Sequence, residues 1–588
     1  MEVIKTDIAI LGAGGGGLRA AIAVAEANPT LHVALISKVY PMRSHTVAAE
    51  GGAAGVAQDI DSLDNHFNDT VTGGDWLCDQ DMVEMFVKEA PRQLTRIEQW
   101  GCPWSRDDDG SVSVRKFGGM KVARTWYAAD KTGFHMLHTL FQTSIQFESI
   151  HRFDEFYATD LMIDDGRCQG VTAIEMRTGQ MKLFLAKAVI IAAGGAGQIF
   201  PFTTNGSIKT ADGMAMAYRA GVPLRDMEFI QYHPTGLPGT GILLTEGCRG
   251  EGGVLRNKDG YRYLQDYEMG PETPLGDPQP KTMELGPRDR LSQAFYHEQK
   301  KGRTVETIFG DAVHLDMTHL GEKKIEDRLP MVRMFAKTYI GVDMVKEPVP
   351  VRPVVHYTMG GIKTDLNGAT LMQGLYALGE CASSGLHGAN RLGSNSLTEL
   401  TVMGLMCGEN AAGFAKEQAG KANESALEKQ AADAEERVFS WVRKSGGGER
   451  PVTIRKEMHE SMEQGVGIYR EAGPIKATCD KIAELRDRYP NVQLEDRSNV
   501  YNTDLFSVLE LGNLLDVAQT LSDGALARTE SRGAHQRLDH PERDDENFLQ
   551  HTLAYYSGKD APRIEYEPVV ITRSQPAERA YGGKAKNG

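Results

Sequence analysis

The sequence lacks the cysteine pairs from which proteins build metal centres. Its 588 residues contain seven cysteines, and no two of them form a CxxC motif: Cys78, Cys102, Cys168, Cys248, Cys381, Cys407 and Cys479. Zinc sites and iron-sulfur clusters draw on several cysteine ligands held close together. We therefore predict no metal site in this chain, and we expect any cluster that serves it to lie in another subunit.

Long apolar runs and an excess of basic residues are missing too. No run of about 18 apolar residues occurs, which is the length that a membrane-spanning helix needs. The chain carries 65 Lys and Arg against 80 Asp and Glu, a net charge of -15, which argues against a nucleic-acid partner. The first apolar strand begins almost at the first methionine and leaves no room for a signal peptide, so we expect the protein to stay on the cytoplasmic side.

Glycine, in contrast, is concentrated near the start of the chain. The apolar run at 7–11 (DIAIL) leads into a glycine cluster, an alanine-rich stretch at 18–27 predicts a helix, and 32–36 predicts the next strand. The spacing of Gly12, Gly14 and Gly17 fits GxGxxG, in which glycine allows a tight turn, close approach of a pyrophosphate and close helix packing. We predict a Rossmann-like dinucleotide-binding fold.

Later stretches favour a flavin over a nicotinamide. The acid expected about 20 residues on, which binds a ribose hydroxyl, is replaced by Ser37 and Lys38, and we expect the serine to serve the ribose. The stretches at 188–197 (AVIIAAGGAG) and 374–381 (GLYALGEC) each predict a buried strand that ends at glycine. Large FAD proteins commonly return to their cofactor in this way, so we predict FAD, with Glu380 near a ribose hydroxyl.

The stretch at 37–54 (SKVYPMRSHTVAAEGGAA) sets one histidine among small hydroxyl residues. Ser44 and Thr46 flank His45, and Gly51 and Gly52 follow shortly after. Glycine lets the main chain approach a flat ring system more closely than any other residue allows. We interpret this stretch as the flavin-attachment segment, with His45 within reach of the ring.

Motifs along nearly the whole chain resemble the flavoprotein subunits of the fumarate reductase and succinate dehydrogenase family. They are RSHTVAAEGG (43–52), QYHPTG (231–236), TEGCRGEGG (245–253), PRDRLSQ (287–293), HYTMGG (356–361), HGANRLGSNSL (387–397) and ESRGAH (530–535). In that family the histidine of RSHT carries FAD, which implies covalent FAD on His45. The resemblance also implies an iron-sulfur subunit, membrane anchor subunits and quinol as partners, with the chain peripheral on the cytoplasmic face of the bacterial inner membrane.

The resemblance implies a small dicarboxylate, fumarate or succinate, as the substrate. In the family the arginine of HGANR and two histidines hold carboxylates, the threonine of TEG assists, and the arginine of PRDR faces the double bond. Arginine suits a carboxylate because its planar fork donates two parallel hydrogen bonds. The implied substrate-binding residues are Phe117, His233, Thr245, His356, Arg391 and Gly52, and the implied catalytic residues are Arg288, Glu246, Arg249 and His233.

In the expected reaction, reduced flavin delivers a hydride to one alkene carbon of fumarate while Arg288 protonates the other. A free guanidinium holds its proton too tightly to be an obvious acid. Glu246 and Arg249 offer a solution, because a carboxylate and a second arginine can pass a proton to Arg288.

The predicted cofactor site joins the glycine turn to the attachment segment and to later positions. It comprises Gly12, Ala13, Gly14, Gly15, Gly16, Gly17, Ser37, Lys38, Ser44, His45, Thr46, Ala49, Glu50, Gly51, Gly52, Asp212, Glu380, Ser396 and Leu397. We also expect loops at 124–130 and 205–212 to fold over the cofactor.

Composition divides the chain into an α/β fold with additions. We predict a discontinuous FAD-binding domain at 1–235 and 354–414, an inserted α+β capping domain at 236–353, a helical domain at 415–543 and a C-terminal segment at 544–588. A hairpin is expected around 557–560 and a disordered polar end from Gly582. Two apolar stripes predict helix packing, at Ile454, Met458, Met462 and Val466 and at Leu505, Val508, Leu511, Leu515 and Ala518.

Three alternatives stay open. L-aspartate oxidase lacks a histidine at the position of His45, and an electron-transfer protein without turnover would not need the set of arginines and histidines. Succinate dehydrogenase runs the reaction backwards, but WGCPWSR (100–106), HYTMGG and GSNSL favour the reductase. Glu50 adds a directional indication, because the family's reductases tend to carry glutamate there and its dehydrogenases glutamine. An ionised Glu50 would lower the flavin potential, whereas burial could neutralise it.

Overall fold

The computed structural model describes residues 1–418, 423–444 and 446–579. At its centre lies a five-stranded parallel sheet in the order β19 (Leu375–Ala377), β11 (Ala188–Ile191), β2 (Ile8–Leu11), β3 (Val33–Ser37) and β7 (Ile150–Asp154). The sheet brings together the three strands predicted to reach the cofactor, since β11 lies between β2 and β19. The predicted α/β class with a Rossmann-like core is confirmed.

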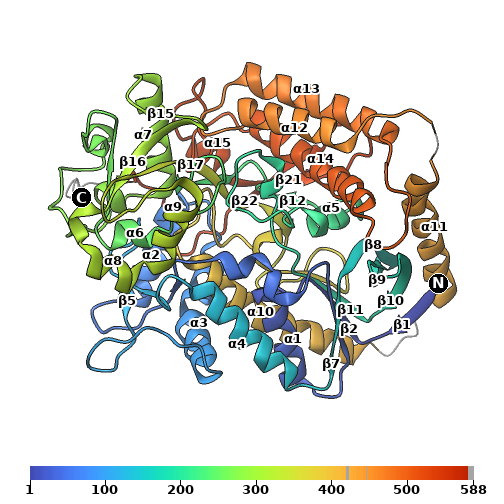
Figure 1. Ribbon diagram of the computed structural model, residues 1–588. Coiled ribbons are helices and arrows are strands. Elements are labelled where there is room, and N and C mark those ends of the chain that lie inside the picture. Colours follow the sequence, from blue (N-terminus) through green and yellow to red (C-terminus); the bar gives the residue numbers. More distant parts are fainter. Residues whose placement is uncertain (419–422, 445, 580–588) are drawn as a thin grey trace.

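Strand alternation gives this sheet two apolar faces. Ile8 and Ile10 of β2 pack on one side, in a cluster with α1 (Gly15–Ala27) and α10 (Asn395–Glu417), whereas Ala9 and Leu11 face the other side. Helix α1 begins three residues before the predicted helix, directly at the end of the glycine turn. Further helices on this side, low in Figure 1, are α2 (Leu63–Gly73), α3 (Gln80–Gln99) and α4 (Thr132–Ile145).

A second sheet packs against the opposite face. It has the order β1 (Glu2–Lys5), β10 (Gln180–Leu185), β9 (Arg167–Glu175) and β8 (Phe156–Asp164), antiparallel except for the β1 and β10 pair. The N-terminal strand β1 belongs to this sheet and was not predicted, because its four residues carry no alternating apolar pattern. Helix α5 (Asp212–Arg219) joins the same apolar cluster.

The inserted unit forms its own core at the left of Figure 1. Its sheet has the order β13 (Ile230–Gly236), β17 (Val349–Thr358), β16 (Gly310–Asp316) and β14 (Val254–Arg256), with β15 (Val305–Thr307) beside β16. Its helices are α6 (Gly247–Gly250), α7 (Arg288–Lys300), α8 (Glu322–Arg328) and α9 (Pro330–Ile340). The predicted boundary at 353/354 falls inside β17, so one continuous strand links this unit to the FAD-binding fold.

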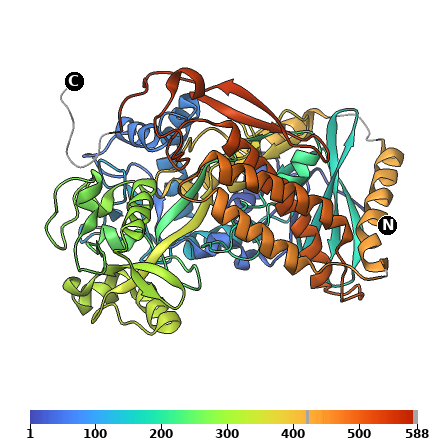
Figure 2. The same cartoon turned by 90° about the horizontal axis from the view of Figure 1, so that it is seen from above.

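Long helices cover the remaining side of the molecule, as Figure 2 shows from above. They are α11 (Glu424–Arg443), α12 (Pro451–Gly465), α13 (Ala472–Arg488) and α14 (Thr503–Ala527). Both predicted apolar stripes are buried. Helix α14 is in addition buried on its other faces, because α5, α12 and α13 all contact it.

The C-terminal part confirms the predicted hairpin. Strands β21 (Gln550–Tyr555) and β22 (Arg563–Pro568) pair antiparallel and extend a sheet with β12 (Leu224–Arg225), β18 (Gly361–Lys363) and β20 (Ala382–Ser383). A short helix, α15 (Asp545–Phe548), precedes the hairpin. The polar end predicted from Gly582 lies outside the described residues.

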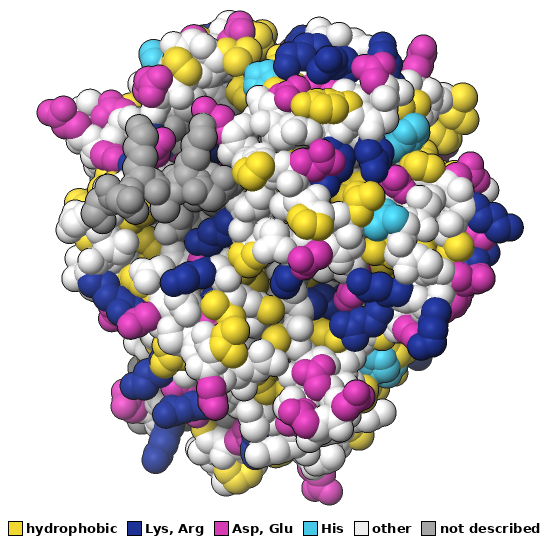
Figure 3. Space-filling model, turned by 90° about the vertical axis from the view of Figure 1, so that its left-hand side faces the viewer, with side chains coloured by type: hydrophobic (Ala, Val, Ile, Leu, Met, Phe, Trp, Pro, Cys, Tyr) yellow, Lys and Arg dark blue, Asp and Glu magenta, His cyan; other side chains and the backbone are white. Residues whose placement is uncertain are grey.

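Charged side chains of both signs lie on the surface (Figure 3), and the cysteines lie in the interior. On the face shown in Figure 3, acidic and basic side chains are interspersed. Within the described ranges, no helix is long and apolar enough to cross a membrane, and no group of histidine, cysteine and acidic residues could hold a metal ion. All seven cysteines are buried and free.

Candidate functional site

A cavity of about 440 Å³ opens where the carboxyl ends of β2, β3, β11 and β19 meet the attachment segment and the inserted unit. This edge of a parallel sheet is where α/β proteins bind their ligands. All predicted cofactor, substrate and catalytic residues line the cavity except Gly17 and Arg249. Residues as distant in the sequence as Gly12 and Leu397 therefore surround one space.

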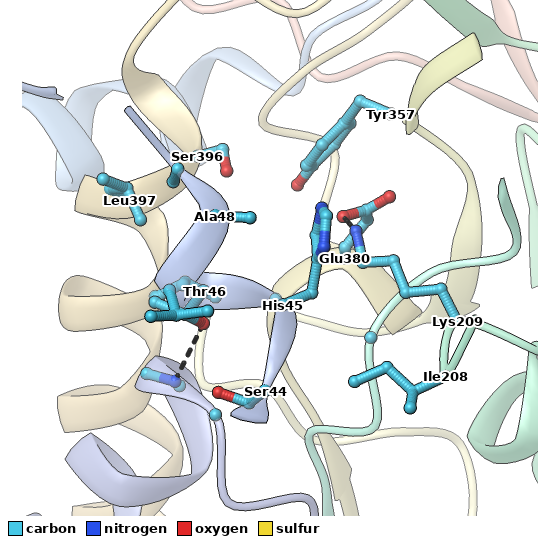
Figure 4. A pocket seen from close by; sticks show the side chains of 18 of the residues that line it. Ser44, His45, Thr46, Ala48, Ile208, Lys209, Tyr357, Glu380, Ser396 and Leu397 are labelled. Atoms are coloured by element: carbon cyan, nitrogen blue, oxygen red, sulfur yellow. Dashed lines mark hydrogen bonds and ion pairs between the residues drawn. The ribbon is translucent and has the colours of Figure 1, made fainter. Parts of the chain in front are cut away.

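The glycine turn after β2 has the geometry of an anion cradle. Gly12 has φ +108°, and a Cβ there would lie 2.2 Å from the Ala192 carbonyl oxygen. A Cβ on Gly17 would lie 1.8 Å from the Gly12 oxygen, so Gly17 serves the packing of α1 and not the lining. The Gly15 N–H donates to Thr46 Oγ1 at 3.1 Å, and the Ser44 hydroxyl is buried without a partner among the described residues (Figure 4). A helix N-terminus beside an unpartnered hydroxyl fits a pyrophosphate.

Lys38, which stands where an acid was expected, is already paired. Its Nζ lies 2.6 Å from Asp212 Oδ2 and 2.8 Å from Glu510 Oε1. Burial favours the neutral form of Asp212, but the Lys38 charge outweighs it and lowers the pKa of that carboxyl. The pair closes one wall of the cavity and leaves Ser37 as the polar group at the end of β3.

His45 extends into the cavity toward Tyr357, Lys209 and Glu380, which come from three other segments (Figure 4). The Gly206 N–H donates to His45 Nδ1 at 3.3 Å. Burial, and then the charge of Lys209, holds the pKa of His45 well below its usual value, so the ring is neutral. Glu380 forms an ion pair with Lys209 and accepts from the Thr358 N–H at 3.2 Å.

The surroundings of Glu50 bear on the two alternatives left open for it, an ionised and a neutral carboxyl. Its side chain is only 3 % exposed, and Oε2 accepts from the Thr245 N–H at 3.2 Å. Burial, with a contribution from the charge of Asp130, raises the pKa of Glu50 well above its usual value. This direction favours the neutral carboxyl, and the effect of Glu50 on the flavin potential stays a prediction.

Two arginines face the cavity side by side. Arg288, at the start of α7, donates from Nη1 to Gln231 Oε1 at 3.0 Å, and Arg391 donates from Nη2 to the same oxygen at 3.1 Å. The Arg391 guanidinium also lies over the Tyr357 ring, 4.2 Å from its centre, while its Nε has no partner in the described part of the chain. Burial, and then the charge of Arg288, lowers the pKa of Arg391 to about 10.

A carboxylate and a third arginine lie behind Arg288. Glu246 Oε2 is 2.8 Å from both Nε and Nη2 of Arg288, and Arg249 Nη2 is 3.8 Å from Glu246 Oε1. Burial acts to raise the pKa of Glu246, but the charges of Arg288 and Arg249 lower it. Arg249 is fully buried and does not line the cavity, so it can reach the substrate only through Glu246.

The two predicted histidines stand opposite each other, with ring centres 5.2 Å apart. His233 Nδ1 accepts from the Thr235 N–H at 3.3 Å, and the pKa of His233 is lowered by burial and by Arg288. A neutral ring that accepts at Nδ1 carries its hydrogen on Nε2, from which it can donate to a carboxylate. Phe117 covers Gly51, where a Cβ would lie 2.7 Å from the phenyl ring.

Of the two loops expected to fold over the cofactor, only one lines the cavity. Residues 208, 209 and 212 of the second loop line the cavity, but none of 124–130 does. Arg124 instead forms buried ion pairs with Asp61 and Asp69, and Asp130 accepts from the Met331 N–H at the start of α9. This loop supports the attachment segment from behind.

Sequence reasoning missed Gln231, Lys209 and Tyr357. Strand alternation gave a signal for Gln231, which lies two positions before His233 on β13 and so shares its face. It gave none for Tyr357, because adjacent residues of a strand point to opposite faces. Lys209 falls within the predicted loop at 205–212, but its partner Glu380 is distant in the sequence.

Comparison with known proteins agrees with this geometry. Residues 7–397 match the family model of the FAD binding domain, and residues 455–581 match the fumarate reductase flavoprotein C-terminal model. The chain is 61% identical over 587 residues to the fumarate reductase flavoprotein subunit of Serratia sp., covering 100% of this chain and 98% of the relative. The chain belongs to the fumarate reductase and succinate dehydrogenase flavoprotein family. As a member with an FAD-binding domain, it binds FAD.

Within the family the two branches differ in similarity. The structure of an Escherichia coli quinol fumarate reductase flavoprotein superposes with a TM-score of 0.97 at 60% identity, covering 100% of both chains. The succinate dehydrogenase flavoprotein subunit of Rickettsia bellii is 39% identical over 606 residues, covering 98% of each chain. The chain thus groups with the fumarate reductases of this family.

Proposed function

We propose that this chain is the catalytic flavoprotein subunit of a quinol:fumarate reductase, which reduces fumarate to succinate during anaerobic respiration. The observation that carries the proposal is the pair of buried arginines, Arg288 and Arg391, in the same cavity as the FAD-binding glycine turn. Glu246 balances the charge of Arg288 only, so a small dianion supplies the negative charge that Arg391 lacks. The higher identity to fumarate reductases supports the direction of the reaction.

Substrate binding uses donors on both sides of the cavity. Arg391 has an unpartnered Nε for one carboxylate, and His233 and His356 supply ring N–H groups beside it. Thr245 and Phe117 border the flavin end, where Gly51 and Gly52 let the main chain approach closely. A carboxylate held by fixed donors can be turned out of the plane of the alkene, which makes the alkene more electrophilic.

When bound and reduced, FAD supplies a hydride to the alkene. The chain supplies the proton from Arg288, whose Nε and Nη2 both lie against Glu246 Oε2. Because Glu246 is ionised and faces Arg249 on its other oxygen, it can take a proton from Arg249 and pass it to Arg288 as Arg288 gives one up. Arg288 therefore never has to remain neutral, which answers the objection that guanidinium is a weak acid.

His45 has the geometry of an attachment point for FAD. Nδ1 is occupied as the acceptor of the Gly206 N–H, so Nε2 is the nitrogen left to bond to carbon. A ring substituted at Nε2 stays neutral and keeps its Nδ1 lone pair, which suits its burial beside Lys209. We propose that FAD is covalently linked to His45 through Nε2.

Electrons reach this chain from other subunits. The E. coli relative is a quinol fumarate reductase by name, and the family resemblance implies an iron-sulfur subunit and membrane anchor subunits that accept electrons from quinol. We propose that the chain docks on these subunits at the cytoplasmic face of the bacterial inner membrane. Purification in mild detergent, with the accompanying subunits identified by mass, tests this assembly.

The activity is tested with the purified flavin-loaded protein and reduced viologen as electron donor. Fumarate-dependent viologen oxidation, inhibited by malonate, is expected; absence of turnover would favour an electron-transfer protein instead. Succinate oxidation faster than fumarate reduction under matched conditions would favour the dehydrogenase.

The attachment is tested separately by acid precipitation and proteolysis. Flavin should remain on the peptide that contains His45, and His45→Ser should bind FAD without the covalent bond. Release of all flavin from the unaltered protein would contradict the attachment but not the activity.

A further inference from the structure

Gln231 contacts both substrate arginines through a single atom. It lies on β13, is fully buried, and its Oε1 accepts from Arg288 at 3.0 Å and from Arg391 at 3.1 Å. Two like charges so close together repel each other unless a shared acceptor lies between them. The amide oxygen of Gln231 occupies that place.

A carboxamide can point either its oxygen or its nitrogen toward a neighbour, and the surroundings of Gln231 fix the choice. Its Nε2 donates to Asn390 Oδ1 at 2.9 Å and to the Arg391 carbonyl oxygen at 2.7 Å. Asn390 in turn donates from Nδ2 to Asp289 Oδ1 at 3.2 Å. A carboxylate accepts only and a guanidinium donates only, so each end of this chain of hydrogen bonds allows one orientation of both amides.

We propose that Gln231 is a positioning residue for Arg288 and Arg391, and that Asp289 sets the orientation of its amide through Asn390. This inference rests on the proposed function, since it assigns the two arginines to one dicarboxylate. Asp289 follows Arg288 on α7, and Asn390 precedes Arg391, so each arginine is flanked by a member of the chain that orients Gln231. Both arginines and their shared acceptor therefore move as one unit.

The neutral charge of the amide is part of this role. A glutamate at the same place would form ion pairs with both arginines and would compete with the carboxylates of the substrate. Glutamine holds the guanidinium groups by one edge and leaves the positive charge of the pair available. The negative charge lies instead on Asp289, at the far side of Asn390 from Gln231. The ion pair of Asp289 with Arg579 at 2.7 Å balances that charge.

The first experiment changes Gln231 and uses another buried glutamine as a control. Gln231→Glu should raise the malonate dissociation constant and the fumarate KM by roughly tenfold or more, because the introduced charge competes with the ligand. Gln231→Met keeps both cations but removes the acceptor, and should lower kcat by roughly tenfold with a smaller change in malonate affinity. Gln293→Met on α7, whose amide donates to the Gly533 carbonyl, should match the unaltered protein.

The second experiment exchanges the acid at position 289 and the amide at position 390. Asn390→Asp places two carboxylates in contact and should lower kcat/KM strongly. Adding Asp289→Asn to it restores an N–H on α7 that can donate to the carboxylate introduced at position 390, and that carboxylate still accepts from Gln231 Nε2. The double variant should therefore recover most of the activity lost in Asn390→Asp, which a purely steric role would not produce.

Malonate affinity is measured by titration followed in the flavin absorption spectrum. The kcat and the fumarate KM are measured from steady-state rates with reduced viologen. Equal kcat and malonate affinity in all Gln231 variants, or no recovery in the double variant, would overturn the positioning role. If the unaltered flavin-loaded protein neither binds malonate nor reduces fumarate, the proposed function fails instead, so the two failures are distinguishable.

Discussion

Two regions of this molecule bury arginine in opposite ways. In the C-terminal region, Arg528 lies 2.7 Å from Glu228 and 2.8 Å from Glu530, and Arg532 lies 2.8 Å from Glu530. In the cavity, Arg391 forms no ion pair with a carboxylate of the described residues and contacts an amide and an aromatic ring. Burial alone therefore does not separate structural from substrate-binding arginines. What distinguishes Arg391 from Arg528 is that it has no carboxylate partner among the described residues.

The pKa values follow the same division. Burial acts to lower the pKa of Arg528, but Glu228 and Glu530 outweigh it and raise that pKa. For Arg391 burial dominates and Arg288 adds to it, which brings its pKa down to about 10. An arginine without a carboxylate partner gains more free energy from binding a dianion than an arginine whose charge is already balanced by a carboxylate.

The largest expected effect comes from Arg391→Met. Loss of two charge-assisted hydrogen bonds, each worth about 1.5–3 kcal/mol, should raise the fumarate KM by about 100-fold or more. Thermal stability should stay the same or increase, because no carboxylate is stranded. Steady-state kinetics and thermal unfolding check both parts; a strong loss of stability would show that Arg391 is structural after all.

Arg528→Met should give the reverse pattern. It strands Glu228 without its cation, whereas Glu530 keeps Arg532. Unfolding should therefore become easier by about 3–5 kcal/mol, while the fumarate KM of the folded protein stays unchanged. Denaturant unfolding measures the loss. Adding Glu228→Leu to Arg528→Met should recover part of it, and failure of this rescue would mean that packing and not charge explains the effect.

Glu50 extends the comparison of buried groups with and without a partner to an acid. It is buried in the cavity wall and forms no ion pair with a cation of the described residues. Its raised pKa means that the folded state binds a proton that the unfolded state releases above its usual pKa of 4.5. Stability is therefore lost as pH rises from that value toward the folded pKa. Glu50→Gln should be more stable than the unaltered protein, with a Tm difference that grows over this window, and should change the flavin potential only at pH values where the carboxyl of Glu50 is ionised.

The smallest effect is expected for an exposed pair. Lys323 and Asp327 on α8 are 3.5 Å apart and 94% and 60% exposed. Solvent screening leaves such pairs with little net energy. Lys323→Ala should change neither the Tm nor the fumarate KM, and a clear shift in either would weaken the argument that burial gives the other pairs their importance.

Sequence patterns predicted the residues that line the cavity better than the contacts among them. Glycine spacing located the cofactor turn because only glycine fits where Gly12 meets Ala192 and Gly17 meets Gly12. The motif resemblance pointed to the arginines and histidines, whose roles stay predictions until they are tested. The pairing of Lys38 with Asp212, and of Lys209 with Glu380, joins positions more than 170 residues apart, and no local pattern records such a partner.

The strand order of the central sheet also determines when the site can form during synthesis. β11 lies between β2 and β19, and α1 packs against α10, which begins only at Asn395. The ribosome makes the glycine turn first, but β19 and the covering helix α10 emerge only after about two-thirds of the chain. An N-terminal fragment that ends before β19 would lack one wall of the cavity, so the cavity is complete only once β19 and α10 have been made.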